Sequence, residues 1–450
     1  MNVVAVGLGV TGMAVARYAT SQGWSTVIVE DDPSRDGHTE RVAEAAAAGA
    51  EVAEAPDEVI LSRLVSTADL VVPSPGVAVG HPVYRLAEAH GRTVVSEIEL
   101  ASRATEIPMV AVTGTNGKTT VTTLVASMLE ASGLRSTAAG NIGRPLLDAI
   151  ADDLDVIVAE VSSFQLQFTD RFRPHVAVVL NVSNDHLDWH PTVAHYRAAK
   201  ARIFANQQPG DVAVLNADDA AVASMASEVP ASVVWFRMGS MEGAYRPEGN
   251  DLVTPTGDVI VALDELPRAL PHDVANAAAA SAAAFAAGAT LDGVAATLRQ
   301  GRSLPHTLAL VGEAGGVRWY DDSKATNPHA TLAALAGFDS VVLLAGGRNK
   351  GLSLEPLREA APRIRAVVAF GEAGPEVEAV FRGVRPVARV VTMRDAVDAG
   401  ASFAEPGDAV ILSPACASFD AYDSYRARGD DFTREVERLV GSAPPQSGVS

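Results

Sequence analysis

The chain has 450 residues, of which 48% are hydrophobic, and its formal net charge is −20. This length predicts about three domains with sizeable cores. The acidity argues against nucleic acid or an anionic membrane as a partner, because phosphate groups attract basic surfaces. The single cysteine, Cys416, excludes an internal disulfide framework and fits a reducing compartment. The opening run MNVVAVGLGV has no basic region ahead of it and predicts a first strand. We expect a cytoplasmic protein without a membrane span, acting as a monomer.

Short β-branched runs alternate with alanine-rich helical stretches along the chain, which is the pattern of parallel α/β sheets. Three such blocks follow one another, at residues 1–96, 97–302 and 303–442. The tail 443–450 contains proline, serine and glycine without periodicity, and we expect it to be disordered.

The first block opens with a glycine-rich turn directly after an apolar strand. The stretch GLGVTG places Gly7, Gly9 and Gly12 in the G-x-G-x-x-G spacing, and Glu30 ends the next expected strand, where a ribose-binding acid would stand. Such a turn lets a diphosphate approach the amino end of the following helix, and NAD and other nucleoside diphosphates suit it equally. The block alone therefore leaves an NAD site, another nucleotide site and a purely structural turn open.

The second block contains VTGTNGKTT, a shortened phosphate-binding loop. A Walker loop would have its first glycine at position 112, where this chain has Val112, and a glycine stands instead at Gly114. Backbone N–H groups of the loop can still point inward, while Lys118 reaches the β and γ phosphates and Thr119 ligates magnesium. Glu160 ends the strand DVIVAE, and ligands of open α/β sheets bind at such strand ends. ATP is therefore the expected ligand of this block.

Two weaker signals follow in the same block. Asp185, His186 and Asp188 come directly after another apolar strand, where they could meet a metal or substrate phosphates. Lys200 lies in the expected helix VAHYRAAKARIF, and composition alone makes it an ordinary surface lysine.

Seven motifs occur in order along the chain: GTNGKTT, GNIG, AEVSSFQL, NVSNDHLD, YRAAKARIF, DDSKATNP and SPACASFD. Together they resemble the Mur ligases over nearly the whole chain, and most closely the branch that adds glutamate to UDP-N-acetylmuramoyl-L-alanine. The resemblance implies an α/β protein with a Rossmann-like N-terminal domain, a central P-loop ATPase-like domain with a parallel sheet, and a Rossmann-like C-terminal domain. It also implies that the shortened loop binds ATP and that the first glycine turn binds UDP instead of NAD.

The implied activity is that of an ATP-dependent acid–amino-acid ligase of peptidoglycan precursor synthesis. ATP converts a carboxylate to an acyl phosphate, and the amine of D-glutamate then attacks to form an amide; L-glutamate or another amino acid is the alternative. Positive charge must gather at the phosphates, and the resemblance gives this role to Lys118 and two magnesium ions. Thr119 and Glu160 would bind one ion, and His186 and a carbamylated Lys200 the other, since a carbamate supplies the oxygen ligands that magnesium prefers.

The resemblance also implies a set of residues for each substrate. The expected catalytic residues are Lys118, Glu160, His186 and Lys200. Those expected to bind ATP are Gly114, Thr115, Asn116, Gly117, Lys118, Thr119, Thr120 and Asn276. Those expected to bind the UDP-muramoyl substrate are Val10, Thr11, Glu30, Asp31, Ser74, Gly76, Asn141, Ser162, Gln165 and His186. Those expected to bind the incoming glutamate are Lys324, Thr326, Lys350, Ser418 and Tyr425.

Two positions depart from the family pattern where ATP should be held. PHDVANA keeps His272 and Asn276 of an H-N-x-x-N element but has Asp273 in the middle, and LPHT has Thr307 in place of an arginine. Arg302 could supply the missing cation. The departures bear on ATP affinity and keep a non-catalytic, nucleotide-gated binding protein open as an alternative. An NAD-dependent oxidoreductase is the other alternative, and it would leave GTNGKTT without a role.

Overall fold

The computed structural model describes residues 1–35, 37–185, 189–301 and 304–441. The chain packs into two compact units. The first comprises Met1–Val182, Ala194–Pro267 and Val274–Gln300, and the second comprises Ser183–Val193, Arg268–Asp273 and Gly301–Ser450. Within the described ranges, no helix has both the length and the apolarity that crossing a bilayer requires.

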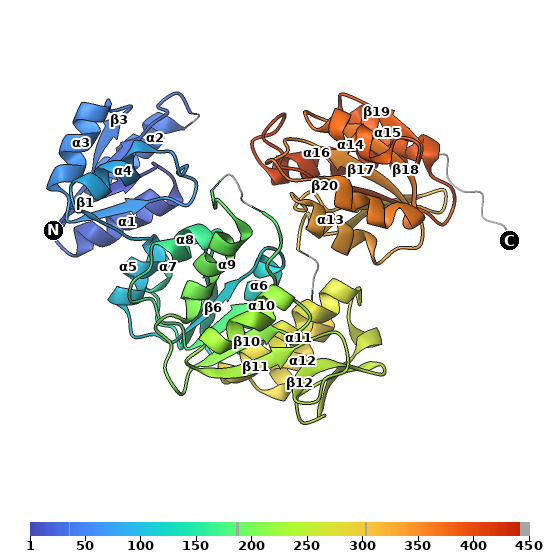
Figure 1. The fold of residues 1–450 in the computed structure, drawn as a ribbon, viewed down its shortest axis with the longest axis horizontal. Helices are drawn as coiled ribbons and strands as arrows, with labels where there is room; N and C mark the ends of the chain where they lie inside the picture. The colour runs from blue at the N-terminus through green and yellow to red at the C-terminus, as the bar shows by residue number, and fades with distance from the viewer. Residues whose placement is uncertain (36, 186–188, 302–303, 442–450) are drawn as a thin grey trace. The chain divides into compact units, whose positions relative to one another are not determined.

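The first unit begins with a parallel five-stranded sheet in the order β3-β2-β1-β4-β5. This sheet and its helices form the blue part of the ribbon at the start of the chain (Figure 1). Its strands are β1 Asn2–Val6, β2 Ser25–Glu30, β3 Glu51–Glu54, β4 Leu70–Pro73 and β5 Thr93–Val94. Its helices are α1 Val10–Ser21, α2 His38–Ala47, α3 Glu58–Thr67 and α4 Pro82–Ala89. The helix α5 (Glu97–Ala104) follows directly and leads into the next sheet.

The second sheet of this unit has nine strands in the order β14-β13-β12-β11-β10-β9-β6-β8-β7. They are β6 Met109–Thr113, β7 Ser136–Gly140, β8 Val156–Glu160, β9 Val176–Val179, β10 Val212–Asn216, β11 Ser232–Phe236, β12 Ala244–Glu248, β13 Asp251–Val253 and β14 Val259–Ala262. The α-helices are α6 Lys118–Ala131, α7 Leu146–Ala149, α8 Ser163–Gln167, α9 Val193–Ala201, α10 Ala220–Ala223, α11 Pro271–Ala286 and α12 Leu291–Gln300. Short 3-10 helices are η1 Arg202–Phe204, η2 Ser224–Glu228 and η3 Leu263–Glu265.

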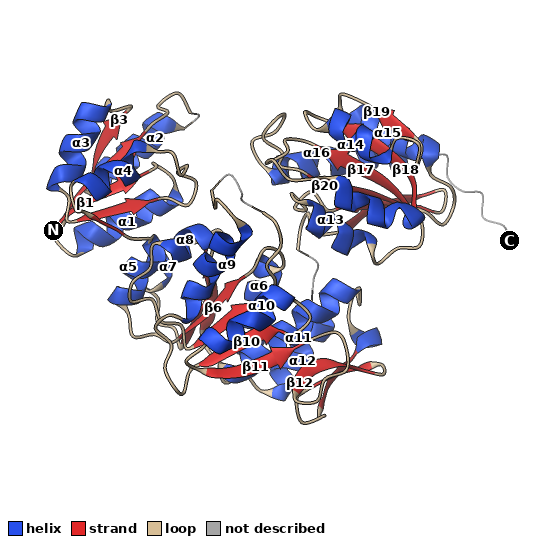
Figure 2. Ribbon diagram, in the orientation of Figure 1, coloured by secondary structure: helices blue, strands red, loops and turns tan. Residues whose placement is uncertain are grey.

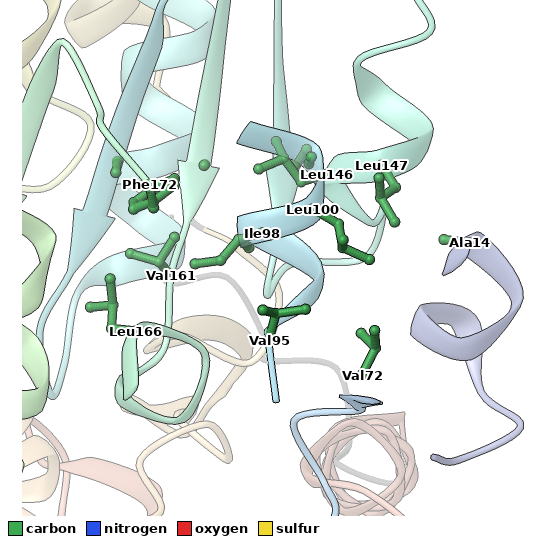
Figure 3. Packing of buried hydrophobic residues seen from close by; sticks show 14 of the residues in the cluster. Ala14, Val72, Val95, Ile98, Leu100, Leu146, Leu147, Val161, Leu166 and Phe172 are labelled. Atoms are coloured by element: carbon green, nitrogen blue, oxygen red, sulfur yellow. The ribbon is translucent and has the colours of Figure 1, made fainter. Parts of the chain in front are cut away.

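Hydrophobic residues on alternate positions of one strand enter different cores, which shows that both faces of the nine-stranded sheet are covered. Val110 and Val112 of β6 pack with α6, α11 and α12, whereas Met109 and Ala111 belong to the other cluster. That second cluster continues from the first sheet through Ile98 of α5 into the nine-stranded sheet (Figure 3). One hydrophobic cluster is therefore common to the two sheets of the first unit.

The second unit contains a six-stranded sheet in the order β15-β16-β20-β17-β18-β19. Its strands are β15 Ala309–Ala314, β16 Val317–Asp321, β17 Val341–Gly346, β18 Ile364–Phe370, β19 Val387–Arg389 and β20 Ala409–Ala415. Its helices are α13 Pro328–Leu335, η4 Glu355–Arg363, α14 Gly374–Phe381, α15 Met393–Phe403 and α16 Tyr425–Gly441. Alternate residues of β17 again enter two different cores, so helices cover both faces of the sheet (Figure 2).

The α/β class and the three sheets that the sequence predicts are confirmed. The antiparallel pairings were not predicted: β12, β13 and β14 form an antiparallel extension at one edge of the nine-stranded sheet, and β15 pairs antiparallel with β16. Both additions lie at sheet edges and are joined by glycine turns at Gly249 and Gly257 and at Gly315 and Gly316, all with positive φ. Such hairpins need only local turn residues, which carry little signal in a sequence of alternating strands and helices.

Candidate active site

The shortened loop joins the end of β6 to the first residue of α6 through Gly117. The φ of Gly117 is 85°, and a Cβ at this position would come within 2.7 Å of the side-chain oxygen of Asn276. Any other residue would therefore clash with Asn276 and strain the turn. This packing brings Asn276 of α11 against the loop, so the two parts of the expected ATP site meet in the first unit.

Asn181, two residues after the end of β9, holds the loop in shape. Its carbonyl oxygen accepts from the N–H of Thr115 at 3.0 Å, its side-chain oxygen accepts from the N–H of Asn116 at 2.8 Å, and its amide nitrogen donates to the Asn116 carbonyl at 3.1 Å. The expectation that these loop N–H groups point inward is wrong for Thr115 and Asn116. A phosphate would instead meet the amino end of α6.

Two lysines converge on one loop carbonyl. Lys118 Nζ donates to the carbonyl oxygens of Gly114 at 3.0 Å and Thr115 at 2.9 Å, and Lys200 Nζ donates to the Gly114 carbonyl at 2.8 Å. Lys200 is only 1% exposed and lies 4.4 Å above the ring of Tyr196, so the interpretation of a surface lysine is wrong. Both side-chain amines therefore lie beside the loop.

Glu160, at the end of β8, accepts hydrogen bonds on both carboxylate oxygens. Thr119 Oγ1 donates to Oε2 at 2.8 Å, and Asn141 Nδ2 donates to Oε1 at 3.0 Å. Gly140 permits this approach, because a Cβ there would lie 2.4 Å from the Glu160 carbonyl oxygen. The structure thus places Asn141, which was expected at the muramoyl substrate, on the expected metal-binding carboxylate.

The donor set at Glu160 fits a magnesium ion. A buried carboxylate beside a threonine hydroxyl offers the hard oxygen ligands that Mg²⁺ prefers, and phosphate oxygens and water would complete the shell. In the described part of the chain, no three His, Cys, Asp or Glu side chains gather into a metal cluster. His186 and Asp188 lie outside the described residues, and so does Arg302.

The first glycine turn has a different arrangement. Gly7 has a φ of 97°, and a Cβ on Gly12 would lie 2.1 Å from the Gly7 carbonyl oxygen. The buried Glu30 carboxylate accepts from the N–H of Leu8 at 2.9 Å and from the N–H of Asp32 at 3.0 Å. The Glu30 carboxylate therefore binds backbone N–H groups, instead of facing outward as an acid that binds the adenosine ribose of NAD would.

Other expected substrate residues of the first sheet lie around this turn. Ser74 follows β4 and stands beside Gly7, and its buried hydroxyl has no hydrogen-bond partner among the described residues. Asp31 follows β2, and its carboxylate lies 3.1 Å from Nε2 of His81. Val10 and Thr11 form the first turn of α1, and Val10 is 65% exposed. An unpartnered hydroxyl and an exposed apolar residue beside the turn suit a ligand held there.

Ser162 and Gln165, also expected at the muramoyl substrate, form the capping box of α8. Ser162 Oγ accepts from the Gln165 N–H at 3.2 Å, and Gln165 Oε1 accepts from the Ser162 N–H at 3.0 Å. Ser162 and Gln165 are therefore hydrogen-bonded to each other, and these bonds fix the amino end of this short helix.

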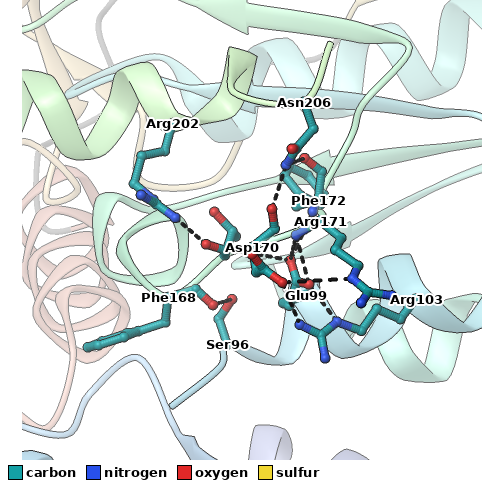
Figure 4. A network of polar contacts seen from close by, with 10 residues as sticks. Ser96, Glu99, Arg103, Phe168, Asp170, Arg171, Phe172, Arg202 and Asn206 are labelled. Carbon is teal, nitrogen blue, oxygen red and sulfur yellow. Dashed lines mark hydrogen bonds and ion pairs between the residues drawn. The ribbon is translucent and has the colours of Figure 1, made fainter. Parts of the chain in front are cut away.

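The turn after α8 is fixed by the buried carboxylate of Glu99 in α5 (Figure 4). Glu99 accepts from the backbone N–H groups of Asp170, Arg171 and Phe172 at 2.9–3.0 Å and from Arg103 Nε at 2.6 Å. Arg202, Asn206 and Ser96 donate to carbonyl oxygens of α8 and of the same turn. This network sets the position of α8 and its capping box within the first unit.

In the second unit, the expected glutamate-binding residues follow three adjacent parallel strands. Lys324 and Thr326 come after β16, Ser418 after β20 and Lys350 after β17, and these strands are neighbours in the order β16-β20-β17. Carboxyl ends of parallel strands lie at one edge of a sheet, so these four residues share that edge. Tyr425 begins α16.

Asp185 meets this edge through two contacts. Lys350 Nζ lies 3.2 Å from Asp185 Oδ1, and Asn327 Nδ2 donates to Asp185 Oδ2 at 3.1 Å. Asp185 is 4% exposed. Asp185 therefore lies beside Lys350, an expected glutamate-binding lysine. The sequence left the role of Asp185 undecided between metal binding and phosphate binding.

The two departures from the family pattern are joined by Arg268. Its guanidinium forms a two-bond ion pair with Asp273, at 2.6 and 2.7 Å, and donates to the carbonyl oxygens of Thr307 at 3.3 Å and Leu308 at 2.6 Å. Sequence reasoning missed Arg268, and the only available signal was an arginine five residues before an unusual acid. Asp273 therefore has a structural partner in this chain.

Comparisons with known proteins place this geometry in one family. The chain matches the models for a Mur ligase MurD-like N-terminal domain at residues 1–96, a Mur ligase middle domain at 112–284 and a Mur ligase glutamate ligase domain at 308–416. It is 40% identical to the UDP-N-acetylmuramoylalanine–D-glutamate ligase of Pelotomaculum thermopropionicum, covering 97% of this chain and 98% of that protein. It is 42% identical to the protein of the same name from Frankia casuarinae, covering 98% and 95%.

Solved structures share the fold at lower identity. The UDP-N-acetylmuramate-alanine ligase MurC of Thermotoga maritima is 20% identical with a TM-score of 0.62, over 98% of this chain and 100% of that one. A pseudomurein peptide ligase type C of Methanothermus fervidus is 16% identical with a TM-score of 0.61, over 97% and 99%. The full-length relatives at 40% and 42% identity, together with three family models in order, establish that the chain belongs to the Mur ligase family, as a MurD-type member.

Proposed function

We propose that the chain joins D-glutamate to UDP-N-acetylmuramoyl-L-alanine with cleavage of ATP, as a cytoplasmic step of peptidoglycan precursor synthesis. The observation that carries this proposal is the site at the amino end of α6, where Lys118, Lys200 and the Thr119–Glu160 pair surround the shortened loop. Full-length relatives with this printed activity support it.

The reaction has two steps. A carboxylate oxygen of the alanyl group attacks the γ-phosphorus of ATP, which releases ADP and leaves an acyl phosphate. The glutamate nitrogen then attacks the carbonyl carbon, phosphate leaves, and the nitrogen gives up a proton as the amide forms. Lys118 would exchange its two loop carbonyls for phosphate oxygens and stabilise the charge that moves from the γ to the β phosphate.

Magnesium would neutralise phosphate charge and polarise the bond that breaks. We propose that Thr119 and Glu160 hold one ion, and that His186 and a carbamylated Lys200 hold a second. Asn141 fixes one oxygen of Glu160 and so orients its other oxygen toward Thr119. The burial of Lys200 beside Tyr196 keeps its amine at the loop, where a carbamate would be shielded from bulk water.

We further propose that each substrate has its own edge of a sheet. UDP would lie at the first glycine turn with Ser74, Thr11 and Gly76, and the muramoyl-alanine part near Asn141 and the α8 capping box. Glutamate would lie at Lys324, Thr326, Lys350, Ser418 and Tyr425, because lysines and hydroxyls are the partners that two carboxylates need. The domain limits 1–96, 97–302 and 303–442 remain part of this proposal.

Phosphate release and product mass test the proposal directly. Purified protein with ATP, Mg²⁺ and UDP-N-acetylmuramoyl-L-alanine should release phosphate continuously when D-glutamate is added, and the sugar nucleotide should gain one glutamyl residue. UDP-N-acetylglucosamine, which has no carboxylate, is the matched control. Turnover with L-glutamate alone would favour the alternative amino-acid specificity. An absence of turnover with either amino acid, despite tight ATP binding, would favour the nucleotide-gated binding protein.

A further inference from the structure

Arg428, in the first turns of α16, is a completely buried arginine with a relative exposure of 0%. Its guanidinium makes five hydrogen bonds. Nε donates to Ser323 Oγ at 2.9 Å and Nη2 to the Ser323 carbonyl at 2.8 Å, while Nη1 and Nη2 reach the Cys416 carbonyl and Nη1 the Ala417 carbonyl, all at 3.2 Å. These bonds end on neutral oxygens, so the planar fork binds backbone carbonyls and one hydroxyl and not a counter-ion.

The oxygens belong to two turns that carry expected glutamate contacts. Ser323 lies immediately before Lys324 in the turn after β16, and Ala417 lies immediately before Ser418 in the turn after β20. The turns also meet directly, since the N–H of Ala415 donates to the carbonyl oxygen of Ala325 at 3.0 Å. The guanidinium therefore lies beneath both turns and sets the spacing between them.

The backbone directly before the Cys416 and Ala417 carbonyls is strained, and this strain helps both carbonyls to reach Arg428. Ala415 has a φ of 59°, a left-handed conformation that is unfavourable for a residue other than glycine. The turn it makes brings two successive carbonyl oxygens, of Cys416 and Ala417, to one nitrogen of Arg428. Strain of this kind persists only where surrounding contacts maintain it.

The remaining two segments of the expected pocket join the same network. Ala417 and Arg348 exchange backbone hydrogen bonds at 2.8 and 2.9 Å, which ties in the turn that carries Lys350. Ser323 Oγ, which accepts from Arg428, donates in turn to the carbonyl oxygen of Tyr425 at 2.8 Å. Every segment that carries an expected glutamate contact is therefore within one or two hydrogen bonds of Arg428.

We propose that Arg428 is the positioning residue of the amino-acid pocket: its guanidinium holds the turns after β16 and β20 at the separation at which their lysines and hydroxyls bind the two carboxylates of the incoming amino acid. The inference rests on the proposed function, because that function assigns glutamate to this edge. It adds a residue that does not touch the substrate and acts through Ser323, Cys416 and Ala417.

Steady-state kinetics of Arg428→Lys and Ser323→Ala test the inference. Lysine keeps the charge but lacks the planar fork, so it replaces only part of the contacts. Loss of a single charge-assisted hydrogen bond shifts an equilibrium on the order of tenfold or more, so the KM for D-glutamate should rise by at least that factor in Arg428→Lys. Ser323→Ala removes one bridging hydroxyl and should raise it several-fold. In both variants the KM values for ATP and for the UDP substrate should stay within about twofold of the wild-type values.

Arg438→Lys is the matched control, because Arg438 lies on the same helix and pairs with Asp398 and Glu435 near the surface. It should leave all three KM values unchanged. A parallel rise of all three KM values in Arg428→Lys, or an unchanged KM for D-glutamate in a folded variant, would overturn the inference. If Arg428→Lys does not fold, Ser323→Ala decides in the same way. A wild-type enzyme that turns over no amino acid overturns the proposed function and the inference with it, so the two failures are distinguishable.

Discussion

The two glycine turns of the first unit start from the same local design and differ in what surrounds them. Each follows the first strand of its sheet and ends at a glycine that caps a helix, Gly9 for α1 and Gly117 for α6. Both can therefore receive a phosphate at a helix amino end. A glycine at the start of the helix therefore does not by itself distinguish a turn suited to binding a diphosphate from one suited to phosphoryl transfer.

The first two helical residues make the difference. In α1 they are Val10 and Thr11, and in α6 they are Lys118 and Thr119. The acid on the neighbouring strand also has different partners: Glu30 accepts from the backbone N–H groups of Leu8 and Asp32, whereas Glu160 accepts from the Thr119 hydroxyl. A lysine and a hydroxyl–carboxylate pair thus distinguish the turn at α6 and suit it to phosphoryl transfer.

The most severe test of this comparison is Lys118→Ala. Removing the ammonium group should lower the rate of phosphate release by on the order of a thousandfold or more, because the charge on the transferring phosphoryl group loses its main protein partner. Val10→Ala, at the corresponding position of the first turn, should leave kcat unchanged. Near-normal turnover in Lys118→Ala would show that the second turn is no more catalytic than the first.

Lys200 is the other buried amine beside the loop and the proposed site of the carbamate, and its removal should be nearly as damaging. Lys200→Ala should lose activity by about a hundredfold or more, and a short carboxylic acid should restore part of it by filling the oxygen-ligand position of the proposed carbamate. Phosphate release with and without acetate measures both effects. Full activity without acetate would show that the buried amine only supports the Gly114 carbonyl.

Thr119 and Thr11 occupy the same helical position and permit a matched exchange. Thr119→Val should lower kcat by about ten- to a hundredfold, since Glu160 loses its hydroxyl partner and the proposed ion a ligand. Thr11→Val should change only the KM for the UDP substrate, by a few-fold. The comparison fails if both substitutions affect the same kinetic parameter.

The smallest effect is expected at Glu30. Glu30→Gln keeps the shape of the side chain but weakens its hydrogen bonds to Leu8 and Asp32, so the KM for the UDP substrate should rise by a few-fold with kcat unchanged. Thermal unfolding of the wild-type protein gives an independent reading. UDP should raise the Tm and NAD should not. A higher Tm with NAD would instead favour the alternative interpretation, in which the first glycine turn is an NAD site.

Much of the fold and the α6 site could be predicted because their signals are local. Glycines at fixed spacing, a lysine at a helix start and an acid at a strand end depend only on neighbouring residues in the sequence. The role of Asn181 could not be predicted, because its partners lie about 65 residues away in the chain. Lys200 and Arg428 both occur in helices, where charged residues are usually exposed, and only tertiary packing buries them.

The carboxylate of Glu99 has a consequence for how the protein responds to acid. Burial alone would raise the pKa of Glu99, but hydrogen bonds from the backbone of Asp170 and Arg171 and from the Arg103 side chain outweigh burial, and the pKa falls below its ordinary value. A lowered pKa in the folded state contributes stability above the ordinary carboxyl pKa, and that stability is lost as the pH falls through the lowered value. Acidification should therefore release the turn at residues 170–172 from α5, and hydrogen exchange at these three amides should accelerate before the rest of the nine-stranded sheet opens.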